Sequence, residues 1–236
     1  MLESFKLTAQ KLKRYLKIHV NLPHSYRTTD KKYPLVLSFD GQYYFNFIKE
    51  NTKIADIDNV INNYEIIFIA IQSPSNELWR ESELNPYYNG KEKQIDKVLS
   101  YIFFEYIMHD LIPMFKERYR ISNDLYVMGY GKAAIASTYM VNKYPEVKGC
   151  GLFSPDFTNV SDEIFTDLDN HYDKTKAIYL YKGERKESYD DSFYNLYLEY
   201  RKYEYEYVIL DYTDEKNDIK CVENHITTFL NFITEK

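Results

Sequence analysis

The sequence predicts an α/β fold built on a mostly parallel, doubly wound sheet, because short apolar runs alternate with amphipathic helical stretches. Most of the runs are apolar along their whole length, as strands are when helices cover both faces of their sheet. Several end at a turn signal, such as Asp40-Gly41 or Ser154-Pro155. The predicted strands are Leu35–Phe39, Ile66–Ile71, Leu125–Met128, Gly151–Phe153, Ala177–Tyr181 and Tyr205–Leu210.

The N-terminal stretch predicts an antiparallel pair of strands at the sheet edge, within Ser4–Leu22. Leu16–Leu22 alternates between apolar and polar residues and ends at Pro23, which suits a half-buried strand. Pro113 is expected to kink the first of the long helices or to begin a new turn there. The predicted helices are Gln94–Arg118, Lys132–Tyr144, Ser192–Tyr203 and Cys221–Ile233.

Length and composition favour one domain, residues 1–236, of ordinary globular character. A net charge of −6 argues against a nucleic-acid partner. No apolar run is long enough for a membrane span, and MLESFKLTAQKLKRYLK lacks the apolar segment of a signal peptide. Two cysteines and five scattered histidines predict no disulfide framework, metal or cofactor, so a cytoplasmic location is expected. The 26 tyrosines spread along the chain, which favours a composition bias over an aromatic surface for a sugar or a partner.

The segment from Leu125 to Ala136 carries the most informative pattern, a strand followed by a tight turn and a helix. So sharp a turn requires small residues on both sides of its apex, and Gly129 and Ala133 meet that need. The apex residue adopts a strained backbone conformation, which Gly131 can adopt without steric cost. The sequence therefore predicts a nucleophile elbow whose apex has no side chain.

The chain resembles the putative-esterase family of α/β-hydrolases, which includes esterase D-like enzymes and ferric-enterobactin esterases. The resemblance covers roughly residues 17–233 and implies the α/β-hydrolase fold. Its motifs in this sequence are Val20-Asn-Leu-Pro23, Pro34-Leu-Val-Leu-Ser-Phe-Asp-Gly41, Arg80-Glu-Ser-Glu83-Leu-Asn-Pro86, Leu111-Ile-Pro113 with Tyr119, the elbow, and Phe153-Ser-Pro155. In order and spacing they are specific for the fold and family, and they do not indicate a substrate.

The resemblance implies a catalytic triad of which two positions are lost. The nucleophilic serine of the family matches Gly131, and the catalytic histidine matches a position near Asn217. The acid would fall within Gly183–Glu187, where Glu187 is the possible survivor. Glycine has no atom for attack and asparagine shuttles no proton near neutral pH. The backbone N–H groups of Lys132 and of Gly41-Gln42 would still form an oxyanion hole.

A small-molecule ligand or ester in the cleft would meet Tyr130, Lys132 and Ser154 besides the strand-end residues Asp40, Gly41 and Gln42. Lys132 is expected to point to solvent, although its charge could favour an anionic ligand. Arg80 and Glu83 stand at helical spacing, so we expect an ion pair between them, with ligand binding by Arg80 as the alternative.

Displaced catalytic groups are also conceivable. The candidate nucleophiles Ser122, Ser137, Ser154 and Cys150 have no evident base partner. His225 lies two turns into the last helix and is expected to be a surface histidine. Two hypotheses remain: a protein that keeps the fold and a binding cleft without serine-esterase activity, and an active carboxylic-ester hydrolase with a displaced nucleophile or a water held by Glu187. The sequence does not indicate an oligomeric state.

Overall fold

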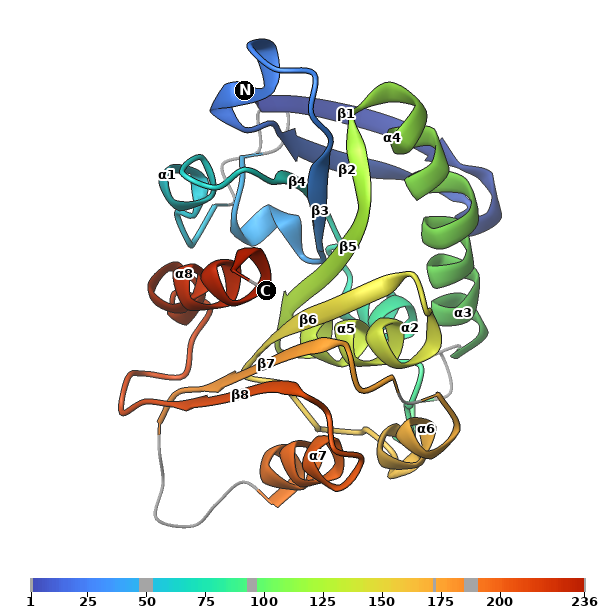
Figure 1. Cartoon of the computed structure of the whole chain (residues 1–236). Helices are drawn as coiled ribbons and strands as arrows, with labels where there is room; N and C mark the ends of the chain where they lie inside the picture. Colours follow the sequence, from blue (N-terminus) through green and yellow to red (C-terminus); the bar gives the residue numbers. More distant parts are fainter. Residues whose placement is uncertain (1, 47–52, 93–96, 172, 185–190, 236) are drawn as a thin grey trace.

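The computed structural model describes residues 2–46, 53–92, 97–171, 173–184 and 191–235. Its eight strands form one sheet in the order β1-β2-β4-β3-β5-β6-β7-β8 (Figure 1). The pairs β1/β2 and β2/β4 are antiparallel, and all the other neighbours are parallel, so the predicted antiparallel edge is confirmed. The strands are β1 Leu2–Ala9, β2 Arg14–Asn21, β3 Tyr33–Ser38, β4 Ile67–Ile71, β5 Ile121–Tyr130, β6 Val147–Phe153, β7 Ala177–Lys182 and β8 Tyr207–Tyr212.

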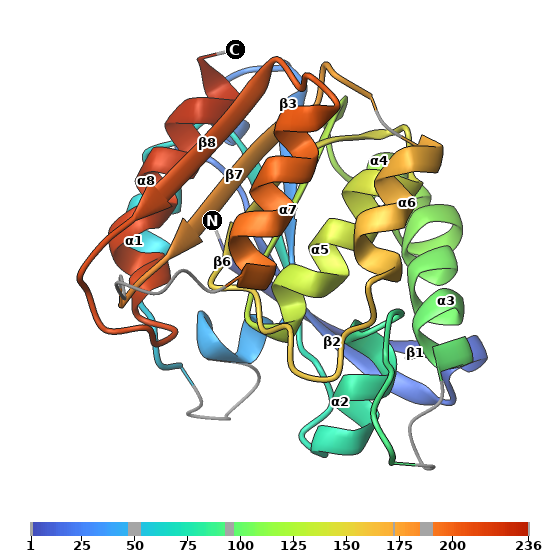
Figure 2. The ribbon, with the colours of Figure 1, turned by 90° about the horizontal axis from the view of Figure 1, so that it is seen from below.

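Helices cover both faces of the sheet, as the continuous apolar strands predict (Figures 1 and 2). The helices α1 and α8 pack on one face, and α2 to α7 pack on the other. The α-helices are α1 Asp58–Ile61, α2 Glu77–Leu84, α3 Lys97–Tyr106, α4 Ile112–Arg118, α5 Lys132–Lys143, α6 Glu163–His171, α7 Asp191–Lys202 and α8 Cys221–Thr234, and the short 3-10 helices are η1 Gln10–Leu12, η2 His24–Arg27 and η3 Gly41–Tyr43.

Alternate residues of each central strand enter two separate cores. Leu35 and Leu37 of β3 face the core under α2 to α7, whereas Val36 faces the core under α8. Burying apolar side chains contributes about 25 cal/mol per Å² on either face, so the sheet is held from both sides. This double burial fixes the carboxyl ends of the parallel strands, where the loops that follow β3 to β8 meet.

The predicted helix 94–118 is interrupted where Pro113 disturbs its hydrogen bonding. A π-helical turn, Ile107–Leu111, joins α3 to α4, and Pro113 lies in the first turn of α4. Proline has no N–H to donate and its ring crowds the preceding turn, so the helix widens there and restarts. Among the described residues no helix has the length and hydropathy needed to cross a membrane.

Candidate active site

Gly131 occupies the apex of a strand-to-helix turn between β5 and α5. Its backbone has φ 60° and ψ −121°, a conformation that side-chain-bearing residues rarely adopt. The N–H of Gly131 donates to the Phe153 carbonyl of β6 at 3.0 Å. A Cβ on Gly129 would lie 2.3 Å from the Ala133 carbonyl carbon, so glycine is required there. A Cβ on Gly131 would meet only the Asp156 Cβ, at 4.0 Å, so the apex has room for a side chain.

The loops at the carboxyl ends of the strands bring Gly131 and Asn217 to one cavity of about 810 Å³. Tyr130, Lys132, Ser154 and Arg80, which the sequence singles out, line the same cavity. The rest of its lining is Tyr43, Ile54, Pro155, Asp156, Phe157, Thr158, Lys182, Asp218 and Ile219.

The loop between β8 and α8 positions Asn217 through backbone atoms. The Tyr130 hydroxyl donates to the Asn217 carbonyl at 3.2 Å. The N–H of Glu184, just after β7, donates to the Glu215 carbonyl at 2.6 Å. Among the described residues the Asn217 side-chain oxygen is buried without a hydrogen-bond partner. It is therefore an acceptor in the wall of the cavity whose hydrogen-bonding capacity the described residues leave unused.

Ser154 follows β6 and adopts a positive φ of 43°. Its N–H donates to the Tyr181 carbonyl of β7 at 2.7 Å, which holds the residue in place. Within the described part of the chain its hydroxyl is buried without a hydrogen-bond partner. Burial raises the pKa of the neighbouring Cys221 thiol to about 12, so Cys221 supplies no base to Ser154.

Lys132 does not point to solvent, and that prediction is wrong. Its side chain is 7% exposed, and its ammonium group lies 3.5 Å from a Glu81 carboxylate oxygen and 3.6 Å from one of Asp156. It also donates to the carbonyl of Asp156 at 3.1 Å and to that of Thr158. These acceptors draw the flexible side chain inward, where it fastens the loop after β6. Its charge is balanced by carboxylates and is not presented to an anionic ligand.

The predicted ion pair between Arg80 and Glu83 is also wrong. Arg80 Nε lies 2.9 Å and 3.2 Å from the two carboxylate oxygens of Asp40, and its Nη2 lies 2.5 Å from the second. Arg14 Nε and Nη2 each donate to a Glu83 oxygen at 2.6 Å. Both arginines form two-pronged bonds to buried carboxylates of other elements, which outcompete a single i,i+3 contact. Asp40 therefore positions Arg80 and does not line the cavity.

Other predicted residues fall outside this cavity. Gly41 begins η3, and Gln42 lines a neighbouring groove. Ser137 donates to the Ala133 carbonyl within α5, and Ser122 lies at the opposite end of β5 and donates to Asp124. Cys150 is fully buried, and burial raises its thiol pKa. Glu187 lies outside the described residues.

His225 is not the exposed histidine that its helix position suggests. Its side chain is 14% exposed, and its Nδ1 lies 3.1 Å from an Asp211 oxygen and its Nε2 lies 3.3 Å from a Glu215 oxygen. The ring stacks on Tyr181, with the centroids 4.1 Å apart. The imidazole thus joins α8 to the end of β8 and does not line the cavity of Gly131.

The N-terminus of α5 gives the cavity a binding group that needs no side chain. The first N–H groups of a helix have no partner within it, and Gly131 offers no side chain as a cap. The Lys132 N–H can therefore donate to a carbonyl oxygen, assisted by the helix dipole. Among the described residues no cluster of three or more His, Cys, Asp or Glu is arranged to hold a metal ion.

Sequence reasoning missed three contributors to the site region. Asp156 and Tyr43 could have been found, because each lies one or two residues beyond a predicted strand-end signal. Trp79 lines the groove beside Gln42, and it lies in the segment 72–83 after the predicted strand Ile66–Ile71, to which the same rule points.

Residues 9–231 match the family model described as Putative esterase. No curated protein matches the chain significantly by sequence.

Solved structures share the fold at low identity. An IroE-like serine hydrolase from Shewanella oneidensis is 14% identical with a TM-score of 0.74, covering 99% of this chain and 79% of that one. The BES protein from Bacillus cereus is 15% identical with a TM-score of 0.74, covering 98% and 95%. The enterobactin esterase FES from Shigella flexneri is 15% identical with a TM-score of 0.77, covering 100% of this chain but 59% of that one. These likenesses confirm the α/β-hydrolase fold.

Proposed function

This chain belongs to the Putative esterase family, and we propose that within it the chain binds a neutral carbonyl compound at the elbow without serine-esterase turnover. One observation carries the proposal: the apex of the elbow is Gly131, and Asn217 lines the same cavity. A serine hydrolase needs a hydroxyl and an imidazole at such positions.

The cavity offers groups suited to a carbonyl ligand. The Lys132 N–H can donate to its oxygen, and the Ser154 hydroxyl and the Asn217 side-chain oxygen lie buried in the wall of the same cavity. A neutral ligand is favoured because the Lys132 ammonium group is already bonded to carboxylate and carbonyl oxygens. The vacant space at Gly131 would take the atoms that a serine side chain occupies in an active hydrolase.

The test measures hydrolysis of short-chain p-nitrophenyl esters by the purified protein and its labelling by a fluorophosphonate. We expect no stoichiometric labelling, and at most the residual acceleration of about 10³–10⁴ over water that binding and an oxyanion hole provide. Robust turnover, or labelling of any serine, would overturn the proposal. Loss of that turnover in Ser154→Ala would then identify a displaced nucleophile.

A Gly131→Ser/Asn217→His variant tests the matching of positions, with Gly131→Ser alone as its control. If the matching is correct, only the double variant places an imidazole across the cavity from the new hydroxyl. We expect faster fluorophosphonate labelling of the double variant than of Gly131→Ser. Equal labelling rates in two folded variants would contradict the placement of Asn217 at the histidine position.

A further inference from the structure

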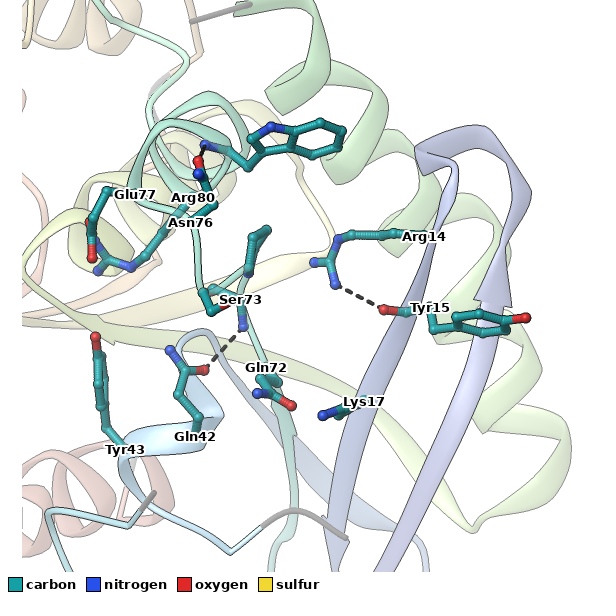
Figure 3. Close-up of a pocket in the computed structure, with 13 residues that line it drawn as sticks. Arg14, Tyr15, Lys17, Gln42, Tyr43, Gln72, Ser73, Asn76, Glu77 and Arg80 are labelled. Atoms are coloured by element: carbon teal, nitrogen blue, oxygen red, sulfur yellow. Dashed lines mark hydrogen bonds and ion pairs between the residues drawn. The ribbon is translucent and has the colours of Figure 1, made fainter. Parts of the chain in front are cut away.

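A second groove lies beside the elbow cavity, on the other side of Arg80 and Tyr43. It has a volume of about 740 Å³, within the range of small-molecule sites. Its walls come from β2, η3, the segment after β4, and α2. Figure 3 shows Gln42, Gln72 and Ser73 between Tyr43 on one side and Arg14 on the other.

Trp79 of α2 lines this groove and is the only tryptophan of the chain. It remains 53% exposed, although indole is among the side chains that gain most from burial. Its backbone is fixed, because its N–H donates to the Asn76 side-chain oxygen at 3.1 Å. An exposed indole on a fixed backbone beside a groove provides a flat apolar surface on which the C–H face of a sugar ring can stack.

Amide groups supply fixed hydrogen-bonding positions around that surface. Gln42 donates to Asp40 at 3.2 Å and accepts from the Ser73 N–H at 3.1 Å, so its amide is oriented by two bonds. One lone pair of the Gln42 oxygen stays outside those bonds, and the amide also hydrogen-bonds the Tyr43 hydroxyl. The Asn76 side chain uses only its oxygen for the helix cap, and its NH2 group is not engaged in that bond. Gln42 and Asn76 thus both contribute hydrogen-bonding groups to the lining of the groove.

Three cationic residues line the groove, Arg14, Lys17 and Arg80, and two of them are paired with buried carboxylates. Arg14 is bonded through two nitrogens to Glu83, and Arg80 is bonded in the same way to Asp40. The guanidinium nitrogens in these bonds are not available to a ligand. The exposed Glu77 adds a negative charge at the rim of the groove. With both guanidinium groups paired, and with Lys17 and Glu77 of opposite charge in the same lining, the groove suits a neutral, hydroxyl-rich molecule.

We propose that this groove binds a neutral oligosaccharide, with one pyranose ring stacked on Trp79 and with hydroxyls along the sugar chain bonded to Gln42 and Asn76. The inference does not depend on the function proposed for the elbow, because none of these three residues belongs to the cavity of Gly131. Sugar binding in this groove is therefore expected whether or not the protein hydrolyses an ester at the elbow.

Because Trp79 is the only tryptophan, its fluorescence reports on this groove alone when excitation is restricted to wavelengths that tyrosine does not absorb. The protein is titrated with xylotetraose, cellotetraose, chitotetraose and maltotetraose, and binding is measured in parallel by isothermal titration calorimetry. We expect a saturable change in emission and matching heat with at least one of them. Absence of both for all four sugars overturns the proposal.

Substitutions then locate the site by calorimetry. Trp79→Ala is expected to weaken sugar binding about tenfold or more, as loss of an aromatic anchor does. Asn76→Asp keeps a helix cap of similar strength but loses the NH2 donors, so it should weaken binding at an unchanged melting temperature. Tyr207→Ala, which removes a similarly exposed aromatic ring at the other edge of the sheet, should leave binding unchanged. Sugar affinity that survives Trp79→Ala, or that falls equally in Tyr207→Ala, overturns the proposal.

Discussion

The two glycines of the elbow should respond very differently to alanine. A Cβ on Gly129 would lie 2.3 Å and 2.4 Å from the carbonyl carbon and oxygen of Ala133, which belong to the backbone of α5. Relieving that overlap requires the helix to move away from β5, at a cost that we place above about 4 kcal/mol. A Cβ on Gly131 overlaps nothing, so its cost is only the backbone strain of about 1–3 kcal/mol.

The assay is urea unfolding of Gly129→Ala, Gly131→Ala and the parent protein, followed by circular dichroism. Gly129→Ala/Ala133→Gly is the control. It removes the Ala133 Cβ, which lies 2.6 Å from the added atom, but leaves the backbone overlap, so it should recover little stability. The reasoning fails if Gly129→Ala unfolds within about 1 kcal/mol of the parent, or if Gly131→Ala is destabilised as strongly as Gly129→Ala.

Three further outcomes are expected. Burial lowers the pKa of His19 to about 4, so the protein should lose up to about 3 kcal/mol of stability as the pH falls from 6.5 to 4. In His19→Gln the midpoint of urea unfolding should depend less on pH across that range. Arg14→Met leaves the Glu83 carboxylate buried and unpaired, so it should cost about 3–5 kcal/mol in urea unfolding, whereas Arg14→Met/Glu83→Leu should cost less. Lys132→Met leaves the buried oxygens that the ammonium group bonds without a donor, so it should lower the free energy of unfolding by about 2–4 kcal/mol and open the segment 156–158 to limited proteolysis. Substitution of the exposed Lys216 by Met should do neither.

The strands could be predicted because local sequence dictates them. Ile67–Ile71 lies between two helical layers, and only an unbroken apolar run can fill both. The elbow could be predicted for a similar reason, because Gly129 and Ala133 are small where a strand meets a helix at close range. The strands and the elbow both depend on residues that are adjacent in the sequence.

The electrostatic partners could not be predicted, because they come from distant segments. Arg80 stands three residues before Glu83, yet it bonds Asp40, which is forty residues away. Glu83 is taken by Arg14 of β2, whose approach to α2 depends on the order of the strands in the sheet. The burial of Lys132 likewise follows from carbonyl groups of the loop after β6, which no spacing within α5 reveals.

The loop that carries Asn217 is fastened by main-chain oxygens, those of Glu215 and of Asn217 itself. Neither of these two hydrogen bonds uses the side chain at position 217. At the apex of the elbow, a Cβ on Gly131 would meet only the Asp156 Cβ, so the backbone there leaves room for a side chain. Framework and reactive groups are thus separable in this protein. Exchanging the groups at positions 131 and 217 would therefore change the chemistry that the cavity offers while the backbone scaffold stays intact.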